Sequence, residues 1–247
     1  MAPIAAPVRP LAERGPFERI VVLTGAGISV AAGLPTYRGP GGLWERDPRL
    51  AAALVAGADP SLVWSVLGPL RPTVAAARPT RAHEALARFE ARQRAAGRSL
   101  TVITQNVDAL HARAGTTSVI ELHGRLTRTR CSNPRCDLPP FDDASAPTKA
   151  PPCPRCGAPL RLDVVLFEEP LGAAEEVAAK RALRDCDLFV AIGTSGTVWP
   201  AASFVRSAAY EGAHTIFANL TPPDPPNPAF REVVLGAAED IVPALFA

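Results

Sequence analysis

Short apolar runs alternate with amphipathic stretches along most of this chain of 247 residues. Each apolar run is followed by glycine or by polar residues. Continuous apolar strands that alternate with helices are typical of a parallel sheet with both faces covered. We therefore predict an α/β fold, with strands at Arg19–Thr24, Ser99–Thr104, Val119–Leu122, Val164–Phe167, Leu188–Ile192, Thr215–Ala218 and Val233–Leu235.

The clearest helical pattern lies between the first two predicted strands. Thr80 can cap a helix, Leu86 and Phe89 lie on one apolar stripe, and Gly97 can end it. We predict this helix over Thr80–Ala96. Further helical segments are predicted within 48–70, directly after the Gln105–Asp108 cluster, and at Ala173–Arg184, Pro200–Tyr210 and Asp240–Leu245.

The alternation breaks over 125–163, where cysteine and proline gather. Four cysteines lie there as two close pairs, whereas Cys186 stands alone beside a predicted strand and is expected in the core. A tetrahedral, structural Zn²⁺ site takes four ligands, and two close pairs of cysteine thiolates can supply them. We predict zinc bound by Cys131, Cys136, Cys153 and Cys156.

Composition excludes several classes of protein. A net charge of +2 gives no sign of a nucleic-acid partner, and no apolar run has the length of about 20 residues that a membrane helix needs. The first residues lack the basic and apolar regions of a secretory signal. We expect a cytoplasmic protein without a membrane partner.

Polar or glycine clusters follow several predicted strands, and in open α/β sheets ligands bind outside the carboxyl ends of the strands. A glycine turn, Gly25-Ala26-Gly27-Ile28-Ser29, follows the first strand and predicts free N–H groups that face a phosphate. It lacks the third glycine of a dinucleotide fingerprint, because that position is Val30. An ordinary structural turn is the alternative. The other clusters are Gln105–Asp108, His123-Gly124, Gly193–Ser195 and Asn219.

Each cluster also has a structural alternative. Asn106 and Asp108 can bond a ribose or a carboxamide, or can cap a helix. His123 can act as a general base near neutral pH, or can be structural. His83 and His214 are expected to be structural, and His111 could support the site.

Taken together, these motifs resemble the sirtuin family of NAD-dependent protein deacylases, and its bacterial branch in particular. The shared segments are GAGIS, GLPTYRG, TQNVDALH, ELHG, the cysteine pairs, VVLF and GTSGTVWPA. The resemblance implies a Rossmann-like NAD-binding domain with helices on both faces. It also implies a small domain made of a helical insertion and a zinc module. The implied limits are a tail at 1–16, the large domain at 17–44, 98–124 and 164–247, the helical part at 45–97 and the zinc module at 125–163.

The resemblance also assigns roles to residues. His123 would be the catalytic base, and Asn106 and Asp108 would act with it on the nicotinamide and its ribose. Acyl-lysine would attack the ribose carbon that bears nicotinamide, and the acyl group would end on ADP-ribose. NAD would be held by Gly25, Ala26, Gly27, Ser29, Thr36, Tyr37, Arg38, Trp44, Gln105, Asn106, Asp108, Gly193, Thr194, Ser195, Asn219 and Ala238.

Two departures from the family pattern affect the substrate. Glu168 stands where the family commonly has glycine, in a segment that pairs with the substrate peptide. Leu67 and Leu70 stand where relatives that remove succinyl groups carry tyrosine and arginine, with Arg71 adjacent. We therefore predict neutral acyl groups on acylated-lysine proteins or peptides. ADP-ribosyl transfer, NAD hydrolysis and a non-catalytic NAD or zinc module are the alternatives, and the oligomeric state, a monomer included, is left open.

Overall fold

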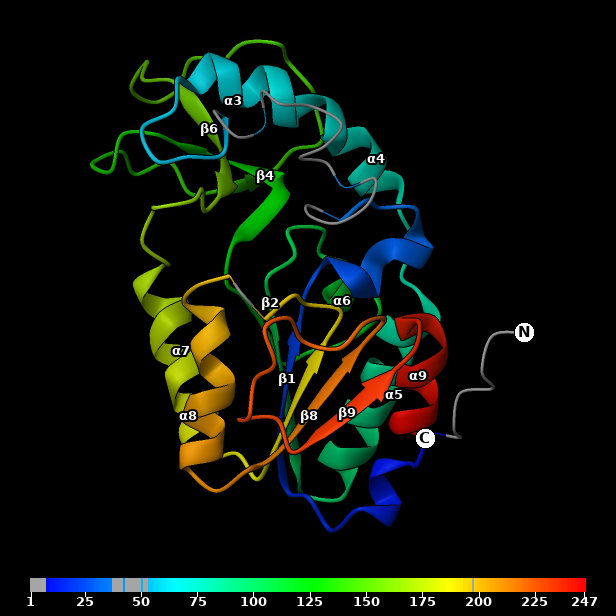
Figure 1. The fold of residues 1–247 in the computed structure, drawn as a ribbon. Coiled ribbons are helices and arrows are strands. Elements are labelled where there is room, and N and C mark those ends of the chain that lie inside the picture. The colour runs from blue at the N-terminus through cyan, green and yellow to red at the C-terminus, as the bar shows by residue number, and fades with distance from the viewer. Residues whose placement is uncertain (1–7, 37–41, 43–49, 51–52, 197) are drawn as a thin grey trace.

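Six strands form one parallel sheet: β1 (Arg19–Thr24), β2 (Ser99–Thr104), β3 (Val119–Glu121), β7 (Leu188–Ile192), β8 (His214–Asn219) and β9 (Glu232–Leu235). The computed structural model describes residues 8–36, 42, 50, 53–196 and 198–247. The strand order is β3-β2-β1-β7-β8-β9 (Figure 1). The order reverses between β1 and β7, which is the switch point of the Rossmann topology.

Helices cover both faces of this sheet. On one face lie α5 (Arg81–Ala95) and α9 (Ala238–Leu245), and on the other lie α7 (Ala173–Arg184) and α8 (Phe204–Tyr210) (Figure 1). Alternate residues of β1 serve the two faces, since Val22 packs in one core and Val21 in the other. Successive side chains of a strand point to opposite faces, so a sheet that is buried on both faces needs continuous apolar runs. The predicted fold class is confirmed.

A second, antiparallel sheet lies beyond the carboxyl ends of the first (Figure 1). It contains β4 (Gly124–Cys131), β5 (Phe141–Asp142) and β6 (Leu160–Val164), in the order β5-β4-β6. Two helices, α3 (Pro60–Leu67) and α4 (Arg71–Ala76), pack beside it. Trp64 of α3 is fully buried and its Nε1 donates to the carbonyl of Leu160 at 2.9 Å. The segment with α3 and α4 and the segment with β4 to β6, which are far apart in the sequence, thus share one core. The predicted domain limits stay predictions.

One predicted strand is wrong in position and partner. The apolar run Val164–Phe167 does not join the parallel sheet, because β6 ends at Val164 and pairs with β4. After it, Val165 N–H donates to the His123 carbonyl at 3.0 Å, and Phe167 bridges to Val55. An apolar run carries no information about which sheet it joins, and here Val164 and Leu166 are buried in the core of the smaller sheet.

The remaining elements are short. The glycine turn continues into the 3-10 helix η2 (Ala26–Ala32) in place of the α-helix start that the motif predicts. No helix in the described part of the chain is long and apolar enough to cross a membrane. The other short helices are η1 (Leu11–Glu13), η3 (Gly68–Leu70), α6 (Leu110–Arg113) and η4 (Ala201–Ser203).

Candidate functional site

The loops after β1 and β7 touch at the switch point of the sheet. The Gly25 N–H donates to the Ile192 carbonyl at 3.0 Å, and the Gly27 N–H donates to the Gly193 carbonyl at 2.8 Å. A Cβ on Gly27 would lie 2.6 Å from the Cα of Gly193, closer than real Cβ atoms approach. This contact between the loops uses the N–H groups of both glycines, so the predicted phosphate contact would fall to other N–H groups of the turn and stays a prediction. The glycines are needed for the close approach of two backbones.

A buried polar network follows β2. Asn106 Nδ2 donates to the Gly25 carbonyl at 3.0 Å and lies 3.3 Å from the Ser29 hydroxyl. Ser29 Oγ in turn donates to Asp108 Oδ2 at 2.7 Å, and all three side chains are buried. This network fixes the amide and the carboxylate beside the glycine turn.

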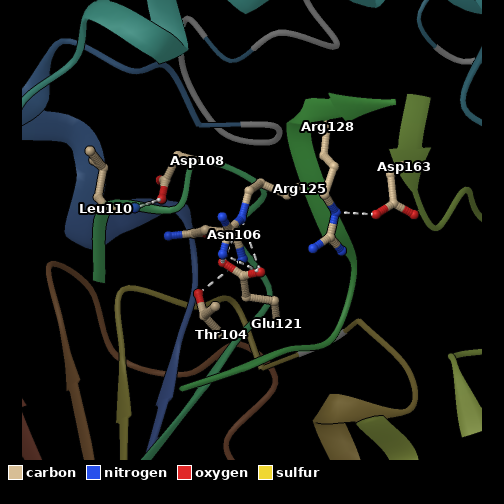
Figure 2. A network of polar contacts seen from close by, with 8 residues as sticks. All are labelled: Thr104, Asn106, Asp108, Leu110, Glu121, Arg125, Arg128 and Asp163. Atoms are coloured by element: carbon tan, nitrogen blue, oxygen red, sulfur yellow. Dashed lines mark hydrogen bonds and ion pairs between the residues drawn. The ribbon is translucent and has the colours of Figure 1, made fainter. Parts of the chain in front are cut away.

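Asp108 also bonds to the backbone next to α6, although it is not the N-cap of that helix, which is Ala109. Its Oδ1 accepts the Leu110 N–H at 2.9 Å at the start of α6 (Figure 2). Burial raises the pKa of Asp108, while the bonds from Leu110 and Ser29 act in the opposite direction. Ala109, which lies between Asp108 and Leu110, adopts a left-handed conformation with a φ of 60°. Residues other than glycine are rare in that region and gather at functional sites.

His123 lies in the bend between β3 and β4. Its Nδ1 is 2.8 Å from the Gln105 carbonyl, which can only accept, so Nδ1 carries the proton and Nε2 keeps its lone pair. Burial lowers the pKa of His123 below the usual 6.5, opposed by the bond to Gln105. At neutral pH the imidazole is therefore neutral, which is the form a general base requires.

The loops after β7 and β8 hold the other predicted cofactor residues. Gln105 Nε2 donates to Thr194 Oγ1 at 3.0 Å, and Asn219 Nδ2 donates to the Thr194 carbonyl at 3.2 Å. Ala238 begins α9, which lies against η2. Ser195 follows Thr194 in the loop after β7, whereas Thr36 lies after η2, at the end of the described segment 8–36. The carboxyl ends of β1, β2, β7 and β8 thus meet, whereas Tyr37, Arg38 and Trp44 lie outside the described residues.

An apolar pocket opens beside the Asn106–Asp108 segment. Ser29, Asn106 and Asp108 form its polar end, and α4 and β4 supply apolar side chains to the rest. An apolar cavity with a few convergent polar groups is the usual form of a small-molecule site. Leu34, Pro35 and Val107 lie within the shared segments GLPTYRG and TQNVDALH, whereas sequence reasoning did not name Thr73, Val74 or Leu126, which carry no local signal of a site.

Two buried histidines support the end of β1 and were not predicted as a pair. The rings of His83 and His111 are 4.6 Å apart between centroids. His111 Nε2 lies 2.9 Å from Thr24 Oγ1, which donates to Thr104 Oγ1 at 2.9 Å. Thr104 Oγ1 then accepts the Asn106 N–H at 3.1 Å. His111 therefore supports the site through these hydroxyls, in line with its predicted role.

The four cysteines predicted as metal ligands form one cluster. Their Sγ atoms all lie within 4.8 Å of one another, with Cys131–Cys156 at 3.6 Å and Cys136–Cys153 at 3.8 Å. A tetrahedral zinc with Zn–S bonds of about 2.3 Å sets its sulfurs about 3.8 Å apart. The same distances are far longer than a disulfide bond of about 2.05 Å. The donor set fits Zn²⁺.

Residues 25–200 match the model of the Sir2 family. This chain belongs to the Sir2 family. A Pyrobaculum aerophilum protein named NAD-dependent protein deacylase 2 is 41% identical over 227 residues, covering 91% of this chain and 88% of the relative. An Escherichia coli O6:H1 protein named NAD-dependent protein deacylase is 42% identical over 233 residues, covering 91% and 81%. The predicted family is confirmed, and the enzyme class agrees with the names of these relatives.

Solved Sir2 structures match the fold over most of its length. A Sir2 homologue in complex with ADP-ribose has a TM-score of 0.84 and 34% identity, covering 93% of this chain and 91% of the other. A Sir2 homologue–NAD complex has a TM-score of 0.81 and 35% identity, covering 93% and 88%. The chemistry of this Sir2 site fits NAD, since Asn106 and Asp108 offer an amide and a carboxylate for a carboxamide and ribose hydroxyls at the crevice where the strand order reverses.

Proposed function

We propose that this Sir2-family chain is an NAD-dependent protein lysine deacylase in which His123 is the general base and neutral acyl groups are preferred. Nicotinamide leaves the ribose of NAD, one water is consumed, and the acyl group moves from the lysine nitrogen to a ribose oxygen of ADP-ribose. The main support for this proposal is the hydrogen bond from His123 Nδ1 to the Gln105 carbonyl. It fixes the tautomer and leaves Nε2 free to take a proton from a ribose hydroxyl.

The surrounding residues have supporting roles. Asn106 and Asp108 orient the nicotinamide half of NAD, and the loops at Thr194 and Asn219 hold the adenosine half. The apolar pocket excludes water from the reacting ribose. The substrates are acylated-lysine peptides, which agrees with a related Sir2 structure that contains a p53 peptide and NAD⁺.

The acyl preference rests on three residues of the helical insertion. Leu70 lines the apolar pocket, and Leu67 is buried. The Arg71 guanidinium is fully buried, bonds to Thr129 at 3.0 Å and pairs with Asp143 at 3.3 Å. A guanidinium committed to these partners is not free to bind the carboxylate of a succinyl group. Neutral acyl groups therefore meet an apolar wall.

The test uses acyl-lysine peptides with NAD, read by mass for O-acyl-ADP-ribose. We expect His123→Ala to lose at least about 100-fold in product formation, the range of a general base. His214→Ala is the matched control, because His214 begins β8 at the opposite end of the sheet. Product formation that survives in His123→Ala would refute the role of the base. In the native protein the rate should rise with pH through a limb below 6.5, because only neutral His123 accepts a proton.

A panel of acetyl-, longer acyl- and succinyl-lysine peptides tests the pocket. Turnover should be highest with the uncharged groups, and a preference for succinyl-lysine would contradict the proposal. Consumption of NAD without a peptide would point to NAD hydrolysis instead. Labelled protein after incubation with labelled NAD would point to ADP-ribosyl transfer.

A further inference from the structure

An ion pair encloses the bend that carries His123. Glu121 is the last residue of β3 and Arg125 is the second residue of β4, so His123 lies midway between them. Arg125 Nε and Nη2 each lie 3.0–3.2 Å from both carboxylate oxygens of Glu121 (Figure 2). The four distances are nearly equal, so the carboxylate lies across the guanidinium edge and each N–H is shared between both oxygens in charge-assisted contacts.

The pair is shielded from water. The Arg125 and Glu121 side chains are 26% and 16% exposed. Exposed pairs between residues four apart contribute little, whereas a partly buried pair is screened less by solvent and salt. This pair therefore restrains the backbone between its two members more than a surface pair would.

The main chain holds the two ends of this bend in different sheets: Glu121 pairs with Thr104 of β2, and Gly124 and Arg125 pair with β6. Gly124 next to His123 has a φ of 77°, and the His123 carbonyl accepts one bond, from Val165 N–H. The regular pairing of β4 with β6 is interrupted directly after Arg125 and resumes at Thr129. The side-chain pair adds a direct link between the end of β3 and the start of β4, which belong to different sheets.

We propose that the Glu121–Arg125 ion pair positions His123 for proton transfer, so that both residues are positioning residues of the reaction. The inference rests on the proposed function, in which His123 is the base. Closing the bend fixes the direction of the imidazole against the Gln105 carbonyl. Base catalysis depends on such alignment, and a displacement of about 1 Å can cost about 100-fold in rate.

The two halves of the reaction separate positioning from folding. Release of nicotinamide precedes the step that needs the base. Exchange of labelled nicotinamide into NAD, with acyl peptide present, therefore reports an intact site without base catalysis. We expect Arg125→Leu and Glu121→Gln to lower O-acyl-ADP-ribose formation about ten-fold or more. Exchange should stay within about two-fold of the native rate.

Two further variants sharpen the test. The double variant Glu121→Arg/Arg125→Glu restores the pair with reversed charges and should recover most of the product rate. Arg128→Leu is the matched control, because Arg128 also lies on β4 in a half-buried ion pair, but its pair with Asp163 does not span the bend (Figure 2). Its product rate should equal that of the native protein.

The outcomes are distinct. Product rates within two-fold of native in both single variants would overturn the proposal, and so would exchange that falls in parallel with product. No recovery in the double variant, with exchange intact, would also count against it. If His123→Ala itself keeps product formation, the proposed function fails. If His123→Ala loses product while the ion-pair variants keep it, only the positioning role fails.

Discussion

The buried pair His83–His111 makes the folded state sensitive to acid. His83 is fully buried, and its Nδ1 lies 3.3 Å from the Thr80 N–H and 2.8 Å from Thr80 Oγ1. No partner among the described residues reaches His83 Nε2 or His111 Nδ1. A proton added to His83 would create a buried cation facing a second imidazole. We therefore expect both histidines to be neutral in the folded protein.

The magnitude follows from the shift in pKa. Burial lowers the pKa of His83 from 6.5 to about 4, and burial with the neighbouring His83 lowers that of His111 as well. As the pH falls, the unfolded chain binds the proton before the folded protein does. The contribution of neutral His83 to the free energy of unfolding is therefore fully present above pH 6.5 and is lost as the pH falls to about 4. For His83 alone the linkage gives a loss of about 2 kcal/mol between pH 7.5 and pH 5, and about 3.4 kcal/mol below pH 4.

The assay compares the free energy of unfolding in urea from pH 7.5 to pH 5 for the native protein and His83→Gln. The variant keeps a polar group near Thr80 but does not titrate, so its stability should fall less with acid. The gap between the two curves should change by about 2 kcal/mol over this range. Zinc loss at low pH affects both proteins alike and cancels in the difference. Arg88→Gln, an exposed change on the same helix, should run parallel to the native curve. Parallel curves for native protein and His83→Gln would refute the reasoning.

Three further changes test the glycine contact, a strained residue and the zinc cluster. Gly27→Ala should destabilise the protein by about 2 kcal/mol or more and weaken NAD binding, because the new Cβ would meet the Gly193 backbone at 2.6 Å. Urea unfolding measures the stability and calorimetric titration measures NAD binding, with Ala26→Gly as the control. Glu168→Gly should raise the free energy of unfolding by about 0.5–1 kcal/mol, since Glu168 has a φ of 69°, and an unchanged value would show that the site bears no strain. Cys153→Ser should abolish binding of one zinc per chain and lower the melting temperature, and native zinc content in this variant would contradict the predicted ligand set.

The sequence alone predicted the six strands of the parallel sheet, because each contains a short apolar run, which is continuous and buried in the inner strands β1 and β7. It also predicted the cluster of four cysteines that fits zinc, since two pairs of cysteines at short spacing are a local signal. The polar clusters after the strands could be placed at one crevice, because parallel strands bring their carboxyl ends together. These features depend on local pattern and on topology.

Only the tertiary structure decided how these residues are used. The need for Gly27 comes from Gly193, and the burial of Arg71 comes from contacts with Thr129 and Asp143. The pairing of His83 with His111 likewise joins separate segments. Contacts between residues distant in sequence leave no periodic trace, and an apolar run cannot specify its sheet, which is why Val164–Phe167 was misplaced. The sequence names the chemical groups of this Sir2 site, and packing sets their partners, tautomers and charge states.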